Sequence, residues 1–373
     1  LKVNSGKVRS CTRTNYLHFK LAVVMDRLHS SPLYRQAFWV NIGGTSIPTH
    51  MRILLLFLLQ GIFLGAAADT RLLVTDLRTE NRKDPMGLDV KSPRFSWKLN
   101  GTERNITQSA YEITVSSSPS ATGDIWKSGK VISAASVWVP YNGPSLVSLK
   151  NYYWRVRVWD GNNKPTGWSA VSHWQTGLLN PSDFTAQWIS VAESEPATET
   201  SDPAPLFRKA FSIGKEIRSA VAVISSQGVY EAFINGKRIG EAVLSPGWTS
   251  YNNRLQYQTY DVTGLLQSGV NAVGASVGNG WYKGYIGFSG QHDFYGKELA
   301  LWLQLDITYK DGSRERVITD GSWSSSYGNI RYSEIYHGET IDARIDQSGW
   351  NTAAGNPAMG WKSVRIKQQT VNL

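Results

Sequence analysis

The chain has 373 residues, of which 39 are Lys or Arg and 29 are Asp or Glu, giving a formal charge of +10. Eight of the basic residues and one of the acidic residues lie in residues 1–68, so the remaining segment carries only +3. This small charge argues against nucleic-acid binding. The one cysteine, Cys11, also lies in that first segment, so the rest of the chain cannot rely on disulfides.

Residues 51–68 have the layout of a secretory signal peptide. The segment MRILLLFLLQGIFLGAAA carries one positive charge at Arg52, an apolar run over residues 53–64 and small residues in an A-x-A arrangement. The run is too short for a membrane span, and no polar face interrupts it as in a buried helix. We therefore predict a protein exported to the periplasm or beyond, without a membrane span after cleavage. Residues 1–50 are excluded from the fold as an untranslated or disordered leader.

Period-two patterns dominate the chain from residue 70 onward. The segments RFSWKL, AYEITV and YYWRVRVWD alternate in the manner of half-buried antiparallel strands, and the turn clusters SPSATGD and DGNNKPTG separate them. Residues 70–178 are therefore predicted to form a small sandwich of about seven strands. Trp97 and Trp154 are assigned to its core rather than to a ligand.

A second, larger β domain is predicted over residues 185–360. Near its start, the polar and Pro-punctuated residues 192–205 are typical of an exposed loop. Asn235-Gly236 supplies the positive φ angles of a type I′ hairpin turn, and Asp311-Gly312 marks a second turn. One strand carries alternating apolar residues on a single face: Leu299, Leu301, Leu303, Leu305 and Ile307. This pattern favours a jelly-roll sandwich, so the predicted fold class is all-β.

Several enzyme motifs can be set aside. The segment GNGWYKG, residues 278–284, lacks the spacing and the βαβ context of a dinucleotide fingerprint. Ser289, His292 and Asp293 are near neighbours in sequence, whereas the partners of a catalytic triad come from separate elements. A calcium site made of Asp and Asn oxygens is compatible with the sequence. The histidines of the two domains lack metal-ligand spacing, which argues against zinc: His173, His292 and His337.

One acidic segment, EIYHGETIDARID, offers the paired carboxylates on which glycoside hydrolysis depends: Glu334, Glu339, Asp342 and Asp346. One hypothesis places Glu339 or Asp342 in a substrate cleft. The hypothesis that we favour makes Asp342 and Arg344 an ion pair in a loop, which together with Glu339 docks a neighbouring domain.

The stretch PGWTSYNNRLQYQTYDV, residues 246–262, is rich in aromatic and amide side chains. Tyr257 and Tyr260 follow a strand-like alternation and are assigned to packing, and a core position is the alternative for Trp248. This turn and the Gly-flanked loop at Trp281 and Tyr282 suit a sugar, because aromatic rings stack on its apolar face and polar groups bind its hydroxyls. The predicted sugar contacts are Tyr251, Asn252, Asn253, Arg254 and Trp281.

Four blocks of the second domain together resemble the N-terminal accessory domain of bacterial α-L-rhamnosidases, glycoside hydrolase family 78: FINGKRIGEAVLSPGWTSYNNRLQYQTYDVTGLL, GNGWYKGYIG, YGKELALWLQLDITYKDGSRERVITDGSW and YHGETIDAR. The preceding segment, from LLVTDLRTEN to YYWRVRVWDGNNKPTGWS, is similar to the fibronectin-III-like domain that opens many of these enzymes. The resemblance covers roughly residues 70–370, in the right order.

The resemblance implies an enzyme that hydrolyses terminal L-rhamnose with inversion, using two carboxylic acids on an (α/α)6 barrel. That barrel lies downstream of the accessory domains, and a stretch like the family's QRDER is absent here, so no catalytic residue is carried over. We therefore expect a non-catalytic N-terminal part that needs its barrel in cis. Residues 361–373 look like the start of a further, truncated domain.

The resemblance also implies a ligand. In some relatives a similar jelly roll binds L-rhamnose, in some cases with calcium, and the matching surface here comprises Asn252, Asn253, Asn279 and Trp281. Rhamnose-containing glycans are thus the expected partners, and calcium is the only cofactor considered. Two alternatives remain: a free-standing carbohydrate-binding module, or a purely structural support for the barrel.

Overall fold

A computed structural model describes residues 72–368, except residues 103, 196–197, 199–200, 288–289, 346–347 and 356–359. The predicted leader of residues 1–50, the predicted signal peptide of residues 51–68, Ser289 and Asp346 lie outside the described residues. All described residues belong to a compact unit that begins at Thr70. Within them, no helix has both the length and the apolar character needed to cross a membrane.

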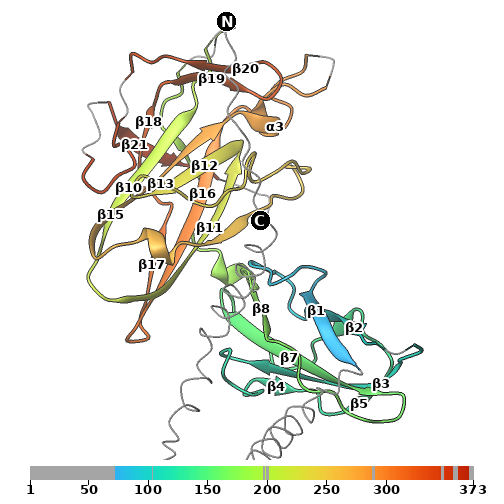
Figure 1. The fold of residues 1–373 in the computed structure, drawn as a ribbon. Coiled ribbons are helices and arrows are strands. Elements are labelled where there is room, and N and C mark those ends of the chain that lie inside the picture. Colours follow the sequence, from blue (N-terminus) through green and yellow to red (C-terminus); the bar gives the residue numbers. More distant parts are fainter. Residues whose placement is uncertain are drawn as a thin grey trace, which may run out of the picture. The chain divides into compact units, whose positions relative to one another are not determined.

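The first sandwich consists of two antiparallel sheets (Figure 1). One sheet contains β1 (Leu73–Thr79), β2 (Arg94–Asn100) and β6 (Val139–Pro140). The other contains β4 (Trp126–Lys127), β5 (Val131–Ile132), β3 (Gln108–Ser116), β7 (Asn151–Asp160) and β8 (Ser172–Gln175). The fold class predicted for this segment from its period-two strands is confirmed.

Alternating residues of β2, β3 and β7 fill the core of this sandwich. Phe95 and Trp154 are buried, with ring centroids 4.4 Å apart. Trp97 is also buried, and its Nε1 donates a hydrogen bond to Gln108 Oε1 at 3.0 Å. Because a buried indole N–H needs an acceptor, this bond fixes the Trp97 ring in the core. The predicted packing roles of Trp97 and Trp154 are confirmed.

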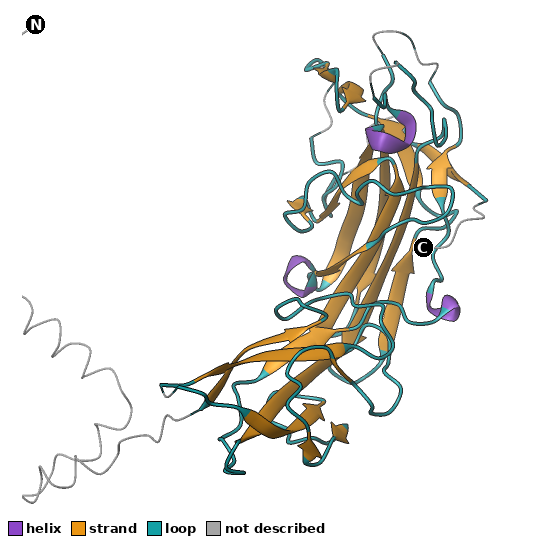
Figure 2. Cartoon of the chain, turned by 90° about the vertical axis from the view of Figure 1, so that its right-hand side faces the viewer, coloured by secondary structure: helices purple, strands orange, loops and turns teal. Residues whose placement is uncertain are grey.

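The second sandwich has eleven strands in a continuous hydrogen-bonded sheet, and helices are limited to short turns (Figure 2). One half contains β13 (Lys237–Arg238), β12 (Val229–Ile234), β15 (Gly269–Gly278), β10 (Pro205–Ile213), β18 (Ser324–Tyr327) and β21 (Lys362–Ile366). The other half contains β9 (Ile189–Val191), β16 (Ala300–Tyr309), β17 (Arg314–Ile318), β11 (Ile217–Gln227) and β14 (Gln258–Asp261). Pairing of β21 with β9 joins the halves, and residues of both form one apolar core.

The remaining elements of the second sandwich are short. A separate hairpin is formed by β19 (Ile330–Glu334) and β20 (Gly338–Ile341). The helical turns are η3 (Thr263–Leu265) and α3 (Gly280–Lys283), while η2 (Pro181–Asp183) lies just before the second sandwich. Figure 1 places α3 at the same end of the sandwich as the β19–β20 hairpin.

The local turn and strand predictions agree with the structure. Asn235 and Gly236 have φ angles of 50° and 79° and connect β12 to β13, as a type I′ turn requires. The predicted apolar face of β16 is buried. On the opposite face, Trp302 and Gln304 are also buried: Trp302 Nε1 donates to Ala186 O, and Gln304 Oε1 accepts from Thr185 N. The first part of β16 is therefore covered on both sides, whereas Asp306 and Thr308 are partly exposed.

The predicted loop of residues 192–205 is observed up to the start of β10, with no strand among its described residues before Pro205. Two backbone hydrogen bonds hold its second half against β19: Asp202 N donates to Arg331 O at 2.8 Å and Ala204 N donates to Ile330 O at 3.1 Å. An ion pair between Arg331 and Glu195 adds to this attachment. The loop is thus fixed at the end of the sandwich that carries α3.

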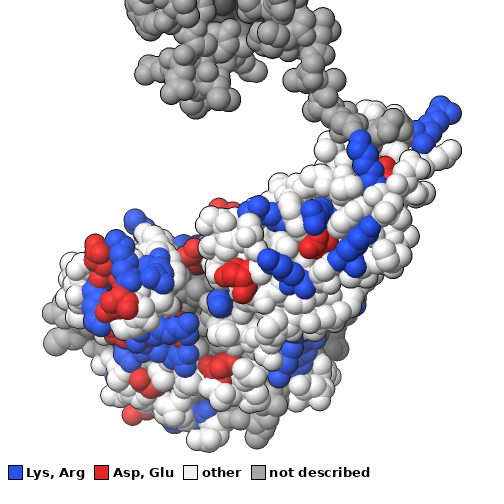
Figure 3. All heavy atoms as spheres, turned by 90° about the horizontal axis from the view of Figure 1, so that it is seen from below, with Lys and Arg blue, Asp and Glu red and all other residues white. Residues whose placement is uncertain are grey.

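The surface charge agrees with the small net charge of the folded part. On the face shown in Figure 3, Lys and Arg side chains are interspersed with Asp and Glu side chains. Ion pairs among the described residues include Arg94 with Glu80 at 2.7 Å and Lys98 with Asp76 at 2.7 Å.

Candidate functional site

The one-turn helix α3 is positioned by the strand before it. Strand β15 ends at Gly278, Asn279 follows, and Gly280 opens the helix with a φ of +54°. A Cβ at Gly280 would lie 2.6 Å from Val229 Cγ1, so both the backbone angle and the neighbouring strand require glycine here. The chain therefore turns sharply over the end of the sandwich and places Asn279 beneath α3.

Asn279 is 2% exposed and binds two acidic residues from distant segments. Its Nδ2 donates to Asp202 Oδ2 at 2.7 Å and to Glu334 Oε1 at 2.8 Å. The second oxygen of each carboxylate is also occupied: Lys283 Nζ lies 2.5 Å from Asp202 Oδ1, and Tyr285 N donates to Glu334 Oε2 at 3.1 Å. The loop, α3 and β19 are thereby joined in one polar network.

A hollow of about 400 Å³ opens above this network, a size within the range of small-molecule sites. Polar, charged and aromatic side chains share its lining: Thr198, Asp202, Lys283, Tyr285, His292, Asp293, Tyr332 and Glu334. Backbone pairing of Asp293 N with Lys283 O at 2.7 Å holds the return segment beside α3. The hollow therefore combines fixed hydrogen-bonding groups with aromatic faces.

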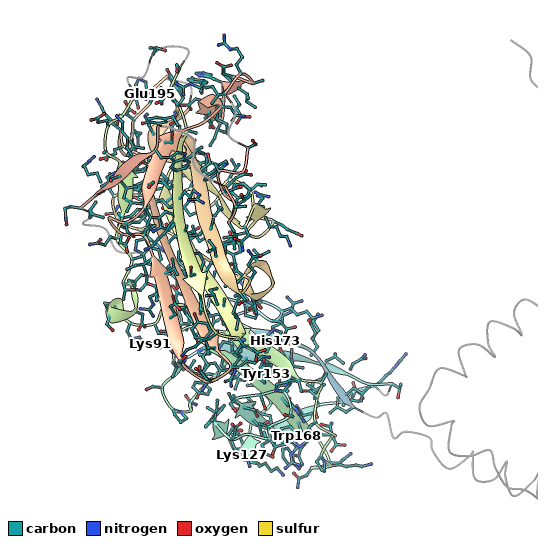
Figure 4. The ribbon with its side chains drawn as sticks, turned by 90° about the vertical axis from the view of Figure 1, so that its left-hand side faces the viewer. Lys91, Lys127, Tyr153, Trp168, His173 and Glu195 are labelled. Carbon is teal, nitrogen blue, oxygen red and sulfur yellow. The ribbon has the colours of Figure 1, made fainter. Side chains whose placement is uncertain are left out.

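Two histidines gather around one tyrosine at this site. The ring of Tyr285 lies 5.2 Å from that of His292 and 4.5 Å from that of His337, measured between centroids. His292 Nδ1 is 2.9 Å from Asp293 Oδ2, and Tyr332 Oη is 3.3 Å from His337 Nδ1. The sequence did not suggest this grouping. His173 belongs to the first sandwich, beside Tyr153 (Figure 4) and 3.4 Å from Asp84.

Trp281 projects from α3 toward an aromatic group. Its ring stacks on that of Trp248, with centroids 6.0 Å apart and an interplanar angle of 8°. Trp248 Nε1 donates to Tyr295 Oη at 3.2 Å, and the Trp248 side chain is 50% exposed. Trp248 is therefore at the surface, and a core position for this residue is wrong. Tyr257 and Tyr260 do pack against the core, as predicted.

The other predicted sugar contacts from the 246–262 stretch lie elsewhere. Tyr251 is 2% exposed, and its hydroxyl donates to Gly247 O at 2.9 Å. Burial, followed by the neighbouring Tyr295, raises its pKa well above the ordinary value. Its ring is thus in the core, which corrects the prediction of a surface contact. Asn252 is exposed, and Asn253 and Arg254 border a different hollow from that of Asn279.

The three residues predicted for docking do not form one cluster. Asp342 and Arg344 form the expected pair, with Nε at 2.8 Å from Oδ1 and Nη2 at 2.7 Å from Oδ2. The Arg344 guanidinium lowers the pKa of Asp342 to about 2. Glu339 instead lines another hollow, of about 500 Å³. Docking of a neighbouring domain by these three residues stays a prediction.

Sequence reasoning missed most of the groups around Asn279. Lys283 and Tyr285 lie in the block GNGWYKGYIG, so the block containing Trp281 was a usable signal for them. Asp202 lies in a loop without apolar periodicity, and Tyr332 lies in a strand that gave no motif. Nothing local in the sequence indicates that these two side chains line the same hollow as Lys283.

The described residues contain no cluster of the side chains that most often bind metal ions. Among them, no group of three or more His, Cys, Asp or Glu side chains is placed to hold a metal ion. The Asp202 and Glu334 oxygens are engaged by the Asn279 amide, the Lys283 ammonium and the Tyr285 N–H. No step of binding is therefore assigned to calcium.

The chain is an all-β module. An immunoglobulin-type sandwich precedes a larger β-sandwich, which carries a polar and aromatic hollow at one end. Comparison with known families identifies it further. The family described as α-L-rhamnosidase N-terminal domain matches residues 215–372, and the Rha78A-like N-terminal immunoglobulin domain matches residues 74–180. The chain therefore contains the two N-terminal domains of the α-L-rhamnosidases of glycoside hydrolase family 78. The fibronectin-III-like expectation agrees, since both names describe the same type of sandwich.

Individual relatives agree with this assignment. An α-L-rhamnosidase of Formosa agariphila is 37% identical over 296 residues, covering 77% of this chain and 32% of that protein. An α-L-rhamnosidase of Alteromonas sp. is 38% identical over 278 residues, covering 72% of this chain and 30% of that protein. The chain thus spans about a third of the length of these curated relatives.

Solved structures show the same architecture. The α-L-rhamnosidase from Dictyoglumus thermophilum is 36% identical with a TM-score of 0.72, covering 80% of this chain and 34% of that chain. The Streptomyces avermitilis α-L-rhamnosidase complexed with L-rhamnose is 26% identical with a TM-score of 0.75, covering 80% of this chain and 45% of that chain.

Proposed function

We propose that this chain is the non-catalytic N-terminal part of an exported α-L-rhamnosidase, and that its second sandwich binds rhamnose-containing glycans. The binding site is the hollow above Asn279, between α3, β19 and the loop that carries Asp202. The family assignment supports the parent enzyme, and the geometry of the hollow supports the binding role. The catalytic domain is expected in cis, in the part of the relatives that this chain does not span.

The observation that carries the binding role is the Asn279 network. Asp202 and Glu334 are held in place by Asn279 and Lys283, so their remaining lone pairs are fixed acceptors for sugar hydroxyls. The rings of Tyr285 and Tyr332 line the same hollow and offer faces to the apolar side of a sugar. Because these groups are fixed before binding, little conformational entropy is lost when a ligand enters.

The same network favours binding over hydrolysis. An inverting glycosidase needs one carboxylic acid that donates a proton and one carboxylate that activates water across the sugar. In the hollow, Asp202 and Glu334 each accept hydrogen bonds from protein donors at both oxygens. They are arranged as acceptors rather than as a proton donor and a base on opposite sides of a ring.

Calorimetric titration of the chain with L-rhamnose tests the binding role. Monosaccharide sites often have Kd values near 1 mM, worth about 4 kcal/mol, so the titration has to extend well above that concentration. Tyr285→Ala, which removes an aromatic wall of the hollow, is expected to weaken binding at least tenfold. The matched control is Tyr336→Ala, whose ring is 58% exposed and does not line the hollow.

Two outcomes would redirect the proposal. A folded chain that produces no heat with L-rhamnose would leave only the role of structural support for a catalytic domain. Binding that survives Tyr285→Ala but is lost in Trp281→Ala would move the site to the stacked Trp248–Trp281 pair. An assay with an aryl α-L-rhamnoside belongs to the same experiment: we expect no turnover, and measurable hydrolysis would overturn the non-catalytic role.

Export is a separate part of the proposal and has a separate test. The A-x-A arrangement at residues 66–68 supports cleavage directly before Asp69. Expression in a bacterial host, followed by N-terminal sequencing of the exported protein, is expected to give Asp69 as the first residue. A protein that stays in the cytoplasm with Met51 or an earlier residue at its start would contradict export.

A further inference from the structure

We propose that the second sandwich holds a second glycan-binding site, in the hollow of about 500 Å³ on the outer face of β12, β15 and β10. We call this hollow the sheet groove. None of the residues lining the sheet groove lines the hollow above Asn279. The inference rests on the proposed function in one respect: both sites take neutral sugars.

The floor of the sheet groove consists of small residues of β15. Val273, Ala275 and Val277 of this strand point into the core and are fully buried. Because side chains alternate along a strand, Gly274, Ser276 and Gly278 face outward. A Cβ at Gly274 would lie 2.6 Å from Trp350 Cζ3, and one at Gly278 would lie 2.8 Å from Ser333 Oγ. Glycine at these two positions therefore lets Trp350 and Ser333 close over the strand and form the walls.

One end of the sheet groove is aromatic. Trp350 meets Phe233 edge-on, with centroids 6.0 Å apart and an interplanar angle of 75°. It also stacks on Trp361, with centroids 6.2 Å apart and an angle of 23°. The indole is therefore held by two aromatic neighbours while it lines the groove. A fixed aromatic wall of this kind suits the apolar face of a sugar ring.

The polar side of the sheet groove carries two carboxylates that differ in their surroundings. Glu231 Oε1 is paired with Arg238 Nη2 at 3.0 Å. Glu339 is exposed, and no side chain in the described part of the chain is seen to pair with its carboxylate. Ser276 and Ser333 also line the groove. The groove thus offers hydroxyl groups and a free acceptor.

This lining selects the class of ligand. Hydroxyl groups of a neutral sugar can donate to Glu339, whereas the carboxylate of an anionic sugar would be repelled by it. The sheet groove is therefore assigned to a neutral sugar unit and not to a uronate. Two sites on one domain would also raise the apparent affinity for a glycan with several terminal sugars, because the second contact is intramolecular.

Indole N–H signals in ¹H–¹⁵N correlation spectra test the sheet groove directly. The Trp350 signal is identified by its absence in Trp350→Phe, and L-rhamnose and D-glucuronate are the neutral and anionic probes. We expect L-rhamnose to shift the Trp350 signal and D-glucuronate to bind at least tenfold more weakly. A Trp350 signal that does not move when the hollow above Asn279 is saturated with L-rhamnose would overturn the inference.

Variants separate this inference from the proposed function. Ser276→Phe fills the sheet groove and should abolish the Trp350 shift, while Ser212→Phe on exposed β10 surface is the matched control. Glu339→Gln changes only a surface group, so it stays informative if Ser276→Phe does not fold, and it should weaken the Trp350 response at least fivefold.

If Tyr285→Ala removes all binding including the Trp350 shift, the second site is wrong and the proposed function stands. If Trp350 responds and Tyr285→Ala changes nothing, the proposed site above Asn279 is wrong.

Discussion

Asn279 Nδ2 lies 2.7 Å from Asp202 Oδ2, although the two residues are 77 positions apart in the chain. The same nitrogen donates to Glu334, so one buried amide satisfies two acidic side chains. Buried carboxylates are costly without donors. This amide therefore both stabilises the end of the second sandwich and shapes the proposed binding hollow.

Replacing Asn279 by alanine should destabilise the fold. The change leaves Asp202 and Glu334 without their shared donor, and we expect a loss of about 1–3 kcal/mol in the free energy of unfolding. Chemical denaturation measures this value. The matched control is Asn252→Ala on the exposed turn, for which we expect a change within about 0.5 kcal/mol. Equal effects of the two variants would show that the network does not stabilise the sandwich.

Gly284→Ala should disturb the binding hollow through one added methyl group. Gly284 has a φ of −68°, which suits alanine, but its Cβ would lie 2.4 Å from both Glu334 Oε2 and Gly280 O. Glu334 has to move, so we expect a loss of about 1–3 kcal/mol of stability and weaker L-rhamnose binding. Gly214→Ala is the control, because a Cβ there meets nothing within 4 Å. Unchanged binding in Gly284→Ala would remove Glu334 from the site.

Stability should fall as the pH rises from 10 to 12. Burial, followed by Glu298, raises the pKa of Tyr282 from 10.0 to about 12. Over this range the unfolded tyrosine loses its proton while the folded one keeps it, so the free energy of unfolding decreases with pH. The contribution of this residue is on the order of 2 kcal/mol. Denaturation at pH 9 and pH 12 should show a smaller decrease in Tyr282→Phe than in wild type or in the exposed control Tyr336→Phe. An identical decrease in all three proteins would contradict the prediction.

Removal of calcium should leave sugar binding unchanged. No group of three acidic, His or Cys side chains among the described residues is placed to hold a metal ion. Titrations with L-rhamnose in calcium and in a chelator are therefore expected to give Kd values within about twofold of each other, less than 0.5 kcal/mol. A tenfold loss of affinity in the chelator would show that backbone or amide oxygens complete a calcium site after all.

Structural features that depend on neighbouring residues were predictable from the sequence, whereas features that depend on contacts between distant residues were not. The period-two segments gave β2, β3, β7 and β16, and Asn235-Gly236 gave the β12–β13 turn, because alternation and turn angles depend on neighbouring residues. The ion pair of Asp342 and Arg344 was also predictable, since the two residues lie only two positions apart in the sequence.

The tertiary structure alone decided the site. Tyr251 and Trp248 lie three residues apart with similar local patterns, yet one ring is in the core and the other is at the surface. Asp202, Asn279 and Glu334 come from a loop, the start of a helix and a strand, and nothing in their local sequence records that they meet. The sequence by itself therefore determined the two β-sandwiches and their family. The packing of distant segments, which balances charge and hydrogen bonds over many residues at once, decided the geometry of the proposed binding hollow.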